Sequence, residues 1–207
     1  IDGAIAVIDN PEITVDELLK YIPAPDFPTG GIIMGRSGIR NAYRTGRGSI
    51  ILRAKCEIEE FNNGTRQRII VTELPYQVNK AQLLKKIADL QEENKEALAG
   101  IADIADESDR SGMRAVIRVR KDYNPQPILD FLFKYTQLQC TYGINMVAIA
   151  DGKPKLMGLL EIIKYYVDYQ INIVVRRTRY DLNKAKERAH ILEGLIIAVN
   201  NIDEVIR

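Results

Sequence analysis

Five arginines follow one another closely in a glycine-rich stretch of the chain, from Pro25 to Arg53. They are Arg36, Arg40, Arg44, Arg47 and Arg53, and no acidic residue occurs between Asp26 and Glu57. A guanidinium group pairs with phosphate oxygens through two parallel hydrogen bonds, and glycine lets main-chain N–H groups approach a bulky ligand. The stretch therefore predicts a polyphosphate-binding surface. A solvated basic turn is the alternative, because basic runs are common.

Charge is strongly segregated along the chain, although the net charge is only +1. Residues 27–56 carry only positive charges, and residues 89–109 carry eight acidic side chains against one lysine. A second basic cluster lies between residues 176 and 188. A protein that presents one face to a polyanion shows this pattern, and so do many helical proteins without such a partner.

Few residues in the chain have the types and spacing that catalysis requires. The single histidine, His190, lies inside a long predicted helix, and the two cysteines are far apart, so no zinc-binding set can be assembled. Gly46-Arg47-Gly48 lacks the third glycine of a dinucleotide fingerprint, and Gly35-Arg36-Ser37 lacks the lysine of a P-loop. The acids of Asp106-Glu107-Ser108-Asp109 are typical of a solvated turn. We predict no catalytic residue and no metal ligand in this chain.

Composition indicates an ordinary globular protein of 207 residues, with 46% hydrophobic and 28% charged residues. No apolar run reaches the roughly 18 residues that span a bilayer, and the start has no signal-peptide pattern. Cys56 and Cys140 have no neighbouring histidine or cysteine, which favours free thiols in a reducing cytoplasm over a disulfide. The absence of an initiator methionine and the end in mid-pattern at Ile206-Arg207 indicate a fragment.

The elements that would position these residues alternate between helices and strands, which predicts an α+β fold with mainly antiparallel strands. Thr14-Val15-Asp16-Glu17 is a capping box, Asn79 is a helix cap, and period-two alternation marks the strands. In chain order we predict a helix over about 14–21, a strand over 50–58, a hairpin turn at Asn62-Asn63-Gly64, a return strand over 66–74, a helix from Asn79 to Leu90, a strand over 113–119, a helix from Pro127 to Tyr135, and a strand over 139–150 closed by Asp151-Gly152.

A very long helix is predicted from about Leu159 to Val199, because this stretch contains no proline and only one glycine. It carries two apolar seams that are out of phase, Leu159, Ile162, Tyr166, Tyr169 and Ile173 in the first and Leu182, Ala185, Ala189, Leu192, Ile196 and Val199 in the second. This pattern favours a helix that leaves a packed body and enters a coiled coil. A single amphipathic helix on its own domain is the alternative, but such helices rarely exceed about 25 residues. Asn201 begins a pattern typical of a new helix.

Six ordered segments carry a family resemblance that spans essentially the whole chain. They are PDFPTGG, GRSGIRNAYRTGRGSI, IIVTELPYQVNKAQL, DESDRSGMR, YGINMVAIADGKPK and ERAHILEGL. In order and interval they resemble the A subunit of bacterial DNA gyrase, a type IIA topoisomerase. They also resemble the A subunit of topoisomerase IV, but TELPYQVNKAQ and YGINMVAI are more similar to gyrase. Ala105 departs from the family, which usually has an arginine there, so an ion pair made by that arginine is in doubt.

The resemblance implies a division of the chain and a set of DNA contacts. Residues 1–35 would connect from an upstream DNA-cleavage domain, residues 36–157 would form the tower domain, and residues 158–207 would form a coiled-coil helix toward the exit gate. A tower contacts the arms of a bent double-stranded DNA away from the cleavage site, through phosphates and shape. The candidate DNA-binding residues are Arg36, Arg40, Arg44 and Arg47, of which Arg40 and Arg44 fall one helical turn apart.

The resemblance also implies an activity for the parent enzyme and a cytoplasmic location. The family cleaves both strands of one duplex, passes another through and reseals, which changes supercoiling. ATP and Mg²⁺ would be bound by the partner B subunit, while a second A subunit would complete the heterotetramer. The attacking tyrosine belongs to an upstream winged-helix segment, and Tyr180 lacks that context, so the chain alone should be inactive in cleavage. A non-enzymatic DNA-binding adaptor with a dimerising coiled coil is the competing hypothesis.

Overall fold

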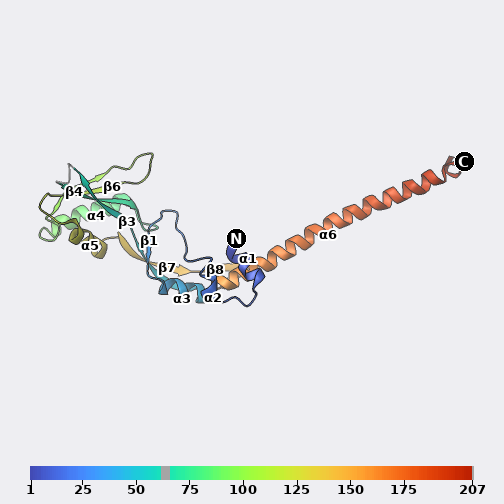
Figure 1. The fold of residues 1–207 in the computed structure, drawn as a ribbon, viewed down its shortest axis with the longest axis horizontal. Coiled ribbons are helices and arrows are strands. Elements are labelled where there is room, and N and C mark those ends of the chain that lie inside the picture. Colours follow the sequence, from blue (N-terminus) through green and yellow to red (C-terminus); the bar gives the residue numbers. More distant parts are fainter. Residues whose placement is uncertain (62–65, 207) are drawn as a thin grey trace. The chain divides into compact units, whose positions relative to one another are not determined.

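The computed structural model describes residues 1–61 and 66–206, which divide into two units. Unit 1 comprises Ile1–Ile13 and Leu160–Arg207, and unit 2 comprises Thr14–Leu159 (Figure 1). The fold is a mixture of helices and antiparallel sheets followed by a long helix, which confirms the predicted fold class. Within the described residues, no helix combines the length and apolar character needed to cross a membrane. The division into connecting segment, tower and coiled-coil helix stays a prediction.

The first sheet of unit 2 is built around β2 (Arg47–Arg53), which pairs antiparallel with β1 (Ile32–Met34) and β7 (Gln139–Asn145). Helix α3 (Ser37–Thr45) packs on β2, and its buried residues Ile39 and Tyr43 share a core with Ile50 and Leu52. The short helix α2 (Val15–Leu18) precedes them. Its predicted capping box is confirmed, because Glu17 N–H donates to Thr14 Oγ1 and Thr14 N–H donates to Glu17 Oε2.

The predicted single strand over 50–58 is wrong, because the chain changes sheet at Ala54. The Ala54 N–H donates to the carbonyl of Leu138 at 2.7 Å, and β3 (Lys55–Phe61) then continues in a different sheet from β2. Ala54 is buried like Leu52 before it, so the alternation of apolar residues runs through the break. Alternating apolar residues indicate that alternate side chains are buried. They do not indicate which neighbouring strand is the hydrogen-bonding partner.

The predicted strand over 139–150 is also two strands, β7 and β8 (Val147–Ala150), separated at Met146. The Met146 N–H donates to the carbonyl of Gly46 at 2.7 Å, the next position in register after Arg47 and Asn145, and from Val147 the chain pairs with a different strand. At Asp151-Gly152, where we predicted the strand to close, both φ angles are positive, 52° and 75°, as a tight hairpin turn requires. The chain returns as β9 (Lys153–Leu156), a strand that we had not predicted.

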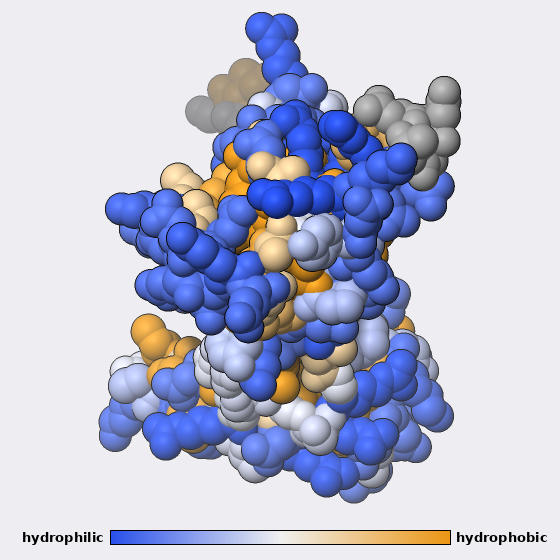
Figure 2. Space-filling view, turned by 90° about the vertical axis from the view of Figure 1, so that its left-hand side faces the viewer, coloured by the Kyte–Doolittle hydropathy of each residue, from blue (hydrophilic) through white to orange (hydrophobic). Residues whose placement is uncertain are grey.

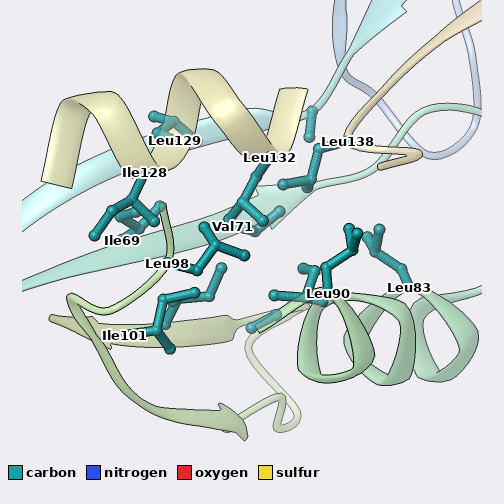
Figure 3. Packing of buried hydrophobic residues seen from close by; sticks show 14 of the residues in the cluster. Ile69, Val71, Leu83, Leu90, Leu98, Ile101, Ile128, Leu129, Leu132 and Leu138 are labelled. Atoms are coloured by element: carbon teal, nitrogen blue, oxygen red, sulfur yellow. The ribbon is translucent and has the colours of Figure 1, made fainter. Parts of the chain in front are cut away.

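The second sheet of unit 2 has the order β3-β4-β6-β5, and every neighbouring pair is antiparallel. It comprises β3, β4 (Arg66–Glu73), β6 (Ala115–Val119) and β5 (Ile101–Asp106). Helices α4 (Lys80–Glu93) and α5 (Pro125–Tyr135) contribute buried residues to the core on one face, where Ile69 and Val71 meet Leu132 of α5 and Leu83 and Leu90 of α4 (Figure 3). On the face drawn in Figure 2 most side chains are hydrophilic, and apolar side chains show between them mainly in the middle.

Side-chain caps determine where the two helices that pack on this sheet begin. Asn79 Oδ1 accepts the N–H of Gln82 at 3.1 Å, which confirms the predicted start of α4. The helix predicted from Pro127 instead begins at Pro125, because Asn124 Oδ1 caps it by accepting the N–H of Gln126. The hairpin turn predicted at Asn62-Asn63-Gly64 lies outside the described residues, whereas the flanking strands β3 and β4 pair as predicted.

Unit 1 contains α1 (Asp2–Asp9), most of α6 (Leu159–Asn200) and α7 (Ile202–Ile206). Helix α6 is continuous over 42 residues, which confirms the long helix predicted over 159–199, and α7 begins just after Asn201 as expected. Helix α1 was not predicted, because its N-cap residue, Ile1, has no capping side chain and the helix is only eight residues long. Of the described side chains beyond Ile173 in α6, only Ala198 is partly buried, and the others are exposed.

Helix α3 can lie on β2 only because Gly38 has no side chain. A Cβ atom there would lie 2.0 Å from the carbonyl oxygen of Ser49. We expect Gly38→Ala to lower the free energy of unfolding by about 2 kcal/mol, because the helix must move off the strand. Urea denaturation followed by the near-ultraviolet signal of the unit 2 tyrosines would measure this.

Gly143→Ala is the matched control for that substitution. Gly143 lies in β7 directly opposite Ser49, but no atom lies within 4 Å of where its Cβ would be. Its effect on the free energy of unfolding should stay within about 0.5 kcal/mol. Equal losses for the two variants would show that the close approach of α3 to β2 is not what makes Gly38 necessary.

Candidate nucleic-acid interface

Helix α3 presents the predicted arginines on its solvent side. It buries Ile39, Ala42 and Tyr43 and leaves Arg40 and Arg44 exposed. Arg36 is its N-cap residue, so three arginines follow one another at four-residue spacing along one side of the helix. Gly46 ends the helix with a φ of 78°, and its N–H donates to the carbonyl of Ala42 at 2.8 Å. The predicted one-turn separation of Arg40 and Arg44 is therefore a real helical spacing.

The underside of α3 is held tightly, so the backbone that carries the arginines is fixed. Gly48 of β2 approaches the helix so closely that a Cβ atom there would lie 2.7 Å from Cβ of Ala42. Tyr43 is buried beside it, and burial, with a smaller contribution from the Asp26 charge, raises the pKa of its phenol to about 12. The phenol is thus neutral at physiological pH and belongs to the core. Because the helix backbone is fixed, the arginines on it can move only by changing their side-chain rotamers.

Two of the four candidate arginines are not free, because Asp16 of α2 pairs with both. Arg40 Nε lies 3.7 Å from Asp16 Oδ1, and Arg44 Nη2 donates to Asp16 Oδ2. All three side chains are about half exposed, at 59%, 57% and 48% for Arg40, Arg44 and Asp16. Exposed ion pairs of this kind contribute about 0–1 kcal/mol each. An incoming phosphate can therefore replace Asp16 at small cost.

The other two candidates remain available. Arg36 and Arg47 are exposed, and neither forms an ion pair with any residue that the structure describes. Arg47 begins β2, and its carbonyl accepts hydrogen bonds from Thr45 Oγ1 at 2.7 Å and Asn41 Nδ2 at 3.4 Å. Its backbone is therefore held at the junction of α3 and β2.

Arg53, the fifth arginine of the stretch, has a structural role. Its Nε donates to Gln139 Oε1 at 2.7 Å, and its guanidinium lies 4.4 Å from the ring centre of Phe133. An arginine stacked on an aromatic ring and bonded to a neighbouring strand is already satisfied within the protein. The structure thus separates Arg53 from the four candidate residues.

The acidic side chains at the end of β5 and just after it form ion pairs and hydrogen bonds within the protein. Asp106 pairs with Lys80 at 2.6 Å and accepts from Ser108, and these bonds, Lys80 first, lower the pKa of its carboxyl to about 2. Glu107 pairs with Arg118 at 2.8 Å and with Arg114 at 3.7 Å. The turn predicted in this segment is confirmed at residues 109–112. Across residues 1–61 and 66–206, no three metal-ligating side chains gather.

Ala105 lies in β5 opposite Val116 of β6, where it carries no ion pair. The acids on the same face of the sheet find their partners in other strands. Glu59 of β3 pairs with Arg68 and Arg114 at 3.0 Å each, and their hydrogen bonds, Arg114 first, hold the pKa of its carboxyl below the usual value. Glu59 and Glu107 thus form their ion pairs without a charged side chain at position 105.

The two cysteines are free thiols, as the sequence predicts. They belong to different sheets, Cys56 to β3 and Cys140 to β7. Burial raises the pKa of Cys56 to about 12 and raises that of Cys140 above its usual value. Neither thiol is a reactive thiolate at neutral pH.

Comparison with known sequences decides the family. Residues 1–207 match the family of DNA gyrase/topoisomerase IV A subunits. The chain belongs to this family. It is 54% identical over 207 residues to the DNA gyrase A subunit of Granulibacter bethesdensis, 56% over 206 residues to that of Clostridium acetobutylicum, and 51% over 207 residues to the chloroplastic/mitochondrial one of Arabidopsis thaliana.

Each of these matches covers 100% of this chain but only 22%, 24% and 22% of the respective relative. The chain thus spans less than a quarter of the length of these relatives. All three are named as gyrase subunits, which favours gyrase over topoisomerase IV, and the family match leaves the adaptor hypothesis without support. In this member of the family, Tyr180 is exposed on α6, and Lys184 Nζ lies 5.2 Å from its ring centre.

Proposed function

We propose that this chain is the DNA-supporting part of the A subunit of a gyrase-like, ATP-dependent type II topoisomerase. The whole enzyme would cleave one duplex, pass a second through the break and reseal it, and so change DNA supercoiling. Residues 1–35 would connect to the DNA-cleavage domain, residues 36–157 would be the tower, and residues 158–207 would lead to the exit gate. The attacking tyrosine would come from outside these residues, and the partner B subunit would bind ATP and Mg²⁺.

The observation that carries the proposal is the row of exposed arginines on α3. Arg36 and Arg47 form no ion pair within the described residues. Arg40 and Arg44 form ion pairs only with Asp16, which is exposed. Their guanidinium forks suit phosphate oxygens, and a backbone fixed on β2 lowers the entropy lost when a duplex binds. Contacts to phosphate position a duplex without reading its sequence. This matches a part that supports DNA away from the site of cleavage.

The long helix supports the second half of the proposal. Its distal seam, Leu182, Ala185, Ala189, Leu192, Ile196 and Val199, steps by three and four residues throughout, which is the heptad spacing of a coiled coil. Leu192 is 43% exposed and Ile196 is 59% exposed, so this seam lacks a covering partner within the described part of the chain. We propose that a returning helix of the A subunit, outside these residues, buries the seam in a coiled coil, and that this chain by itself buries the seam against a second copy.

The pairing of Asp16 with α3 provides a test of the DNA contact. We expect Asp16→Asn to raise the affinity of the chain for a short DNA duplex about two- to fivefold at low salt, because Arg40 and Arg44 no longer have to leave a carboxylate. Fluorescence anisotropy of a labelled duplex would measure the affinity. Asp89→Asn on α4 is the control, because Asp89 is exposed and unpaired within the described residues. The same gain in both variants, or no gain in either, would place the DNA contact elsewhere.

A further inference from the structure

A second basic site lies on the four-stranded sheet, away from α3. It is a recess of about 630 Å³, and five of the residues that line it are cations, whereas only one is an acid. The cations are Arg66, Arg68, Arg118, Arg120 and Lys121, and the acid is Asp103. The lining therefore carries a net charge of +4 at neutral pH. No motif in the sequence marks these residues, because they are distributed over two segments about fifty positions apart.

Strand register explains why the arginines meet. Arg68 of β4 lies directly opposite Arg118 of β6 in the antiparallel ladder. Successive side chains of a strand point to opposite faces, so Arg66 lies on the face of Arg68, and Arg120, just after β6, continues the face of Arg118. Ile69 and Ile117, the next pair in register, point into the apolar core on the other face. Like charges placed directly opposite one another destabilise a sheet, so this arrangement has an energetic cost.

The acids of this face neutralise only one end of the arginine row. Glu59 binds Arg68 at 3.0 Å, and Asp103 and Glu107 bind Arg118 at 2.6 Å and 2.8 Å. The other three cations of the recess are exposed, and none of them forms an ion pair within the described part of the chain. They are Arg66, Arg120 and Lys121. The recess thus combines two guanidiniums fixed by carboxylates with three cations that are free to close on an anion.

We propose that this recess binds a phosphate group of the DNA backbone, as a second contact separate from α3. The inference rests on the proposed function, since it assumes that unit 2 supports a duplex. The Arg68 guanidinium carbon lies 5.3 Å from the ring centre of Phe61, which adds a second restraint to the one from Glu59. A planar guanidinium held in one orientation is suited to bidentate contact with phosphate oxygens, and flexible cations at the rim can complete the contact.

Extended DNA fits the placement of the recess better than a small free polyphosphate does. The four-stranded sheet and α3 lie toward opposite ends of unit 2 (Figure 1). A small anion can occupy one of the two basic sites, whereas one duplex offers regularly spaced phosphates to both. Binding at two separated sites also raises the effective concentration of the second contact. A free polyphosphate is therefore the competing outcome for the experiment.

The test compares three variants of the chain in binding to a labelled short duplex over a range of salt concentrations. The recess variant carries Arg66→Ala, Arg120→Ala and Lys121→Ala, and the control carries Lys85→Ala, Lys86→Ala and Arg110→Ala. The α3 variant carries alanine at Arg36, Arg40, Arg44 and Arg47, the four candidate arginines on α3 and at the start of β2. The control residues are exposed cations of unit 2 outside both sites. We expect the recess variant to bind roughly tenfold more weakly and to flatten the log–log salt slope by about 0.9, the value for one phosphate. The control should bind like the unchanged chain.

Each outcome separates the recess from the proposed function. If the recess variant binds like the control while the α3 variant loses binding, the recess proposal is overturned and the α3 contact stands. If the recess variant loses binding while the α3 variant binds like the control, the recess is supported as a DNA contact and the proposed DNA contact at α3 is overturned. In a second arm, arginine Nε–H resonances are followed by NMR during titration with the duplex or with inorganic tripolyphosphate. Shifts at Arg66, Arg118 and Arg120 with the duplex support the proposal, and shifts with tripolyphosphate alone overturn it in favour of a free-anion site.

Discussion

Replacing Arg36, Arg40, Arg44 and Arg47 together by alanine should remove most of the duplex DNA binding of this chain. Each guanidinium that contacts a phosphate releases counterions, so the log–log salt slope falls by about 0.9 for each contact that is lost. If all four arginines contact phosphates, the slope should flatten by roughly 3.6. Anisotropy titrations at several salt concentrations would measure both the slope and the loss of affinity. The fold should be retained, because the exposed ion pairs that break contribute little stability.

Two pairs of substitutions refine this experiment. Arg36→Ala with Arg47→Ala removes the unpaired cations, and Arg40→Ala with Arg44→Ala removes those that face Asp16. We expect the first pair to cost more affinity, because the second pair of arginines must first leave a carboxylate. A quadruple variant with an unchanged salt slope would mean that these arginines face protein in the assembled enzyme.

Leu192→Asp should abolish self-association through the distal half of α6. Leu192 lies in the middle of the distal seam, and a seam of this length is too apolar to remain in water without a partner. Burying a carboxylate in place of leucine in both copies of a dimer should weaken association about 100-fold or more. Sedimentation velocity over a range of concentrations would measure the association. Unit 2 should remain folded, as monitored by the near-ultraviolet signal of its tyrosines.

Ile191→Asp is the matched control for the seam. Ile191 is the adjacent residue of the same helix and is 53% exposed against 43% for Leu192, but it does not belong to the three-and-four spacing. Its substitution should leave the association constant nearly unchanged. A chain that is monomeric at every concentration, with the distal helix fully protected from hydrogen exchange, would contradict the coiled-coil prediction.

Local signals in the sequence were sufficient for the elements that local chemistry determines. Asn79 caps α4 through a side chain that lies next to the helix, and the 42 residues of α6 form a helix because nothing in them breaks one. The capping box at Thr14 and the start of α7 after Asn201 are confirmed for the same reason. The four-residue spacing of Arg40 and Arg44 likewise predicted correctly that they share one side of a helix.

The elements that the sequence did not reveal depend on partners far away along the chain. After Ala54 the chain stops pairing with β7 and pairs with β4, and after Met146 it stops pairing with β2 and pairs with β9. Neither change of partner leaves a trace in the local pattern of apolar residues. Helix α1 has no cap and so gave no local signal.

The same distinction applies to the candidate sites. The sequence by itself determined that a row of arginines would lie on a glycine-rich segment, because residue type and helical spacing are local properties. Only the tertiary structure decided which of them are free, since Asp16 reaches Arg40 and Arg44 from a different helix. It also created the basic recess, because strand register brings Arg68 opposite Arg118 across about fifty residues of chain. Electrostatic interactions depend on distance in space, and the fold determines that distance.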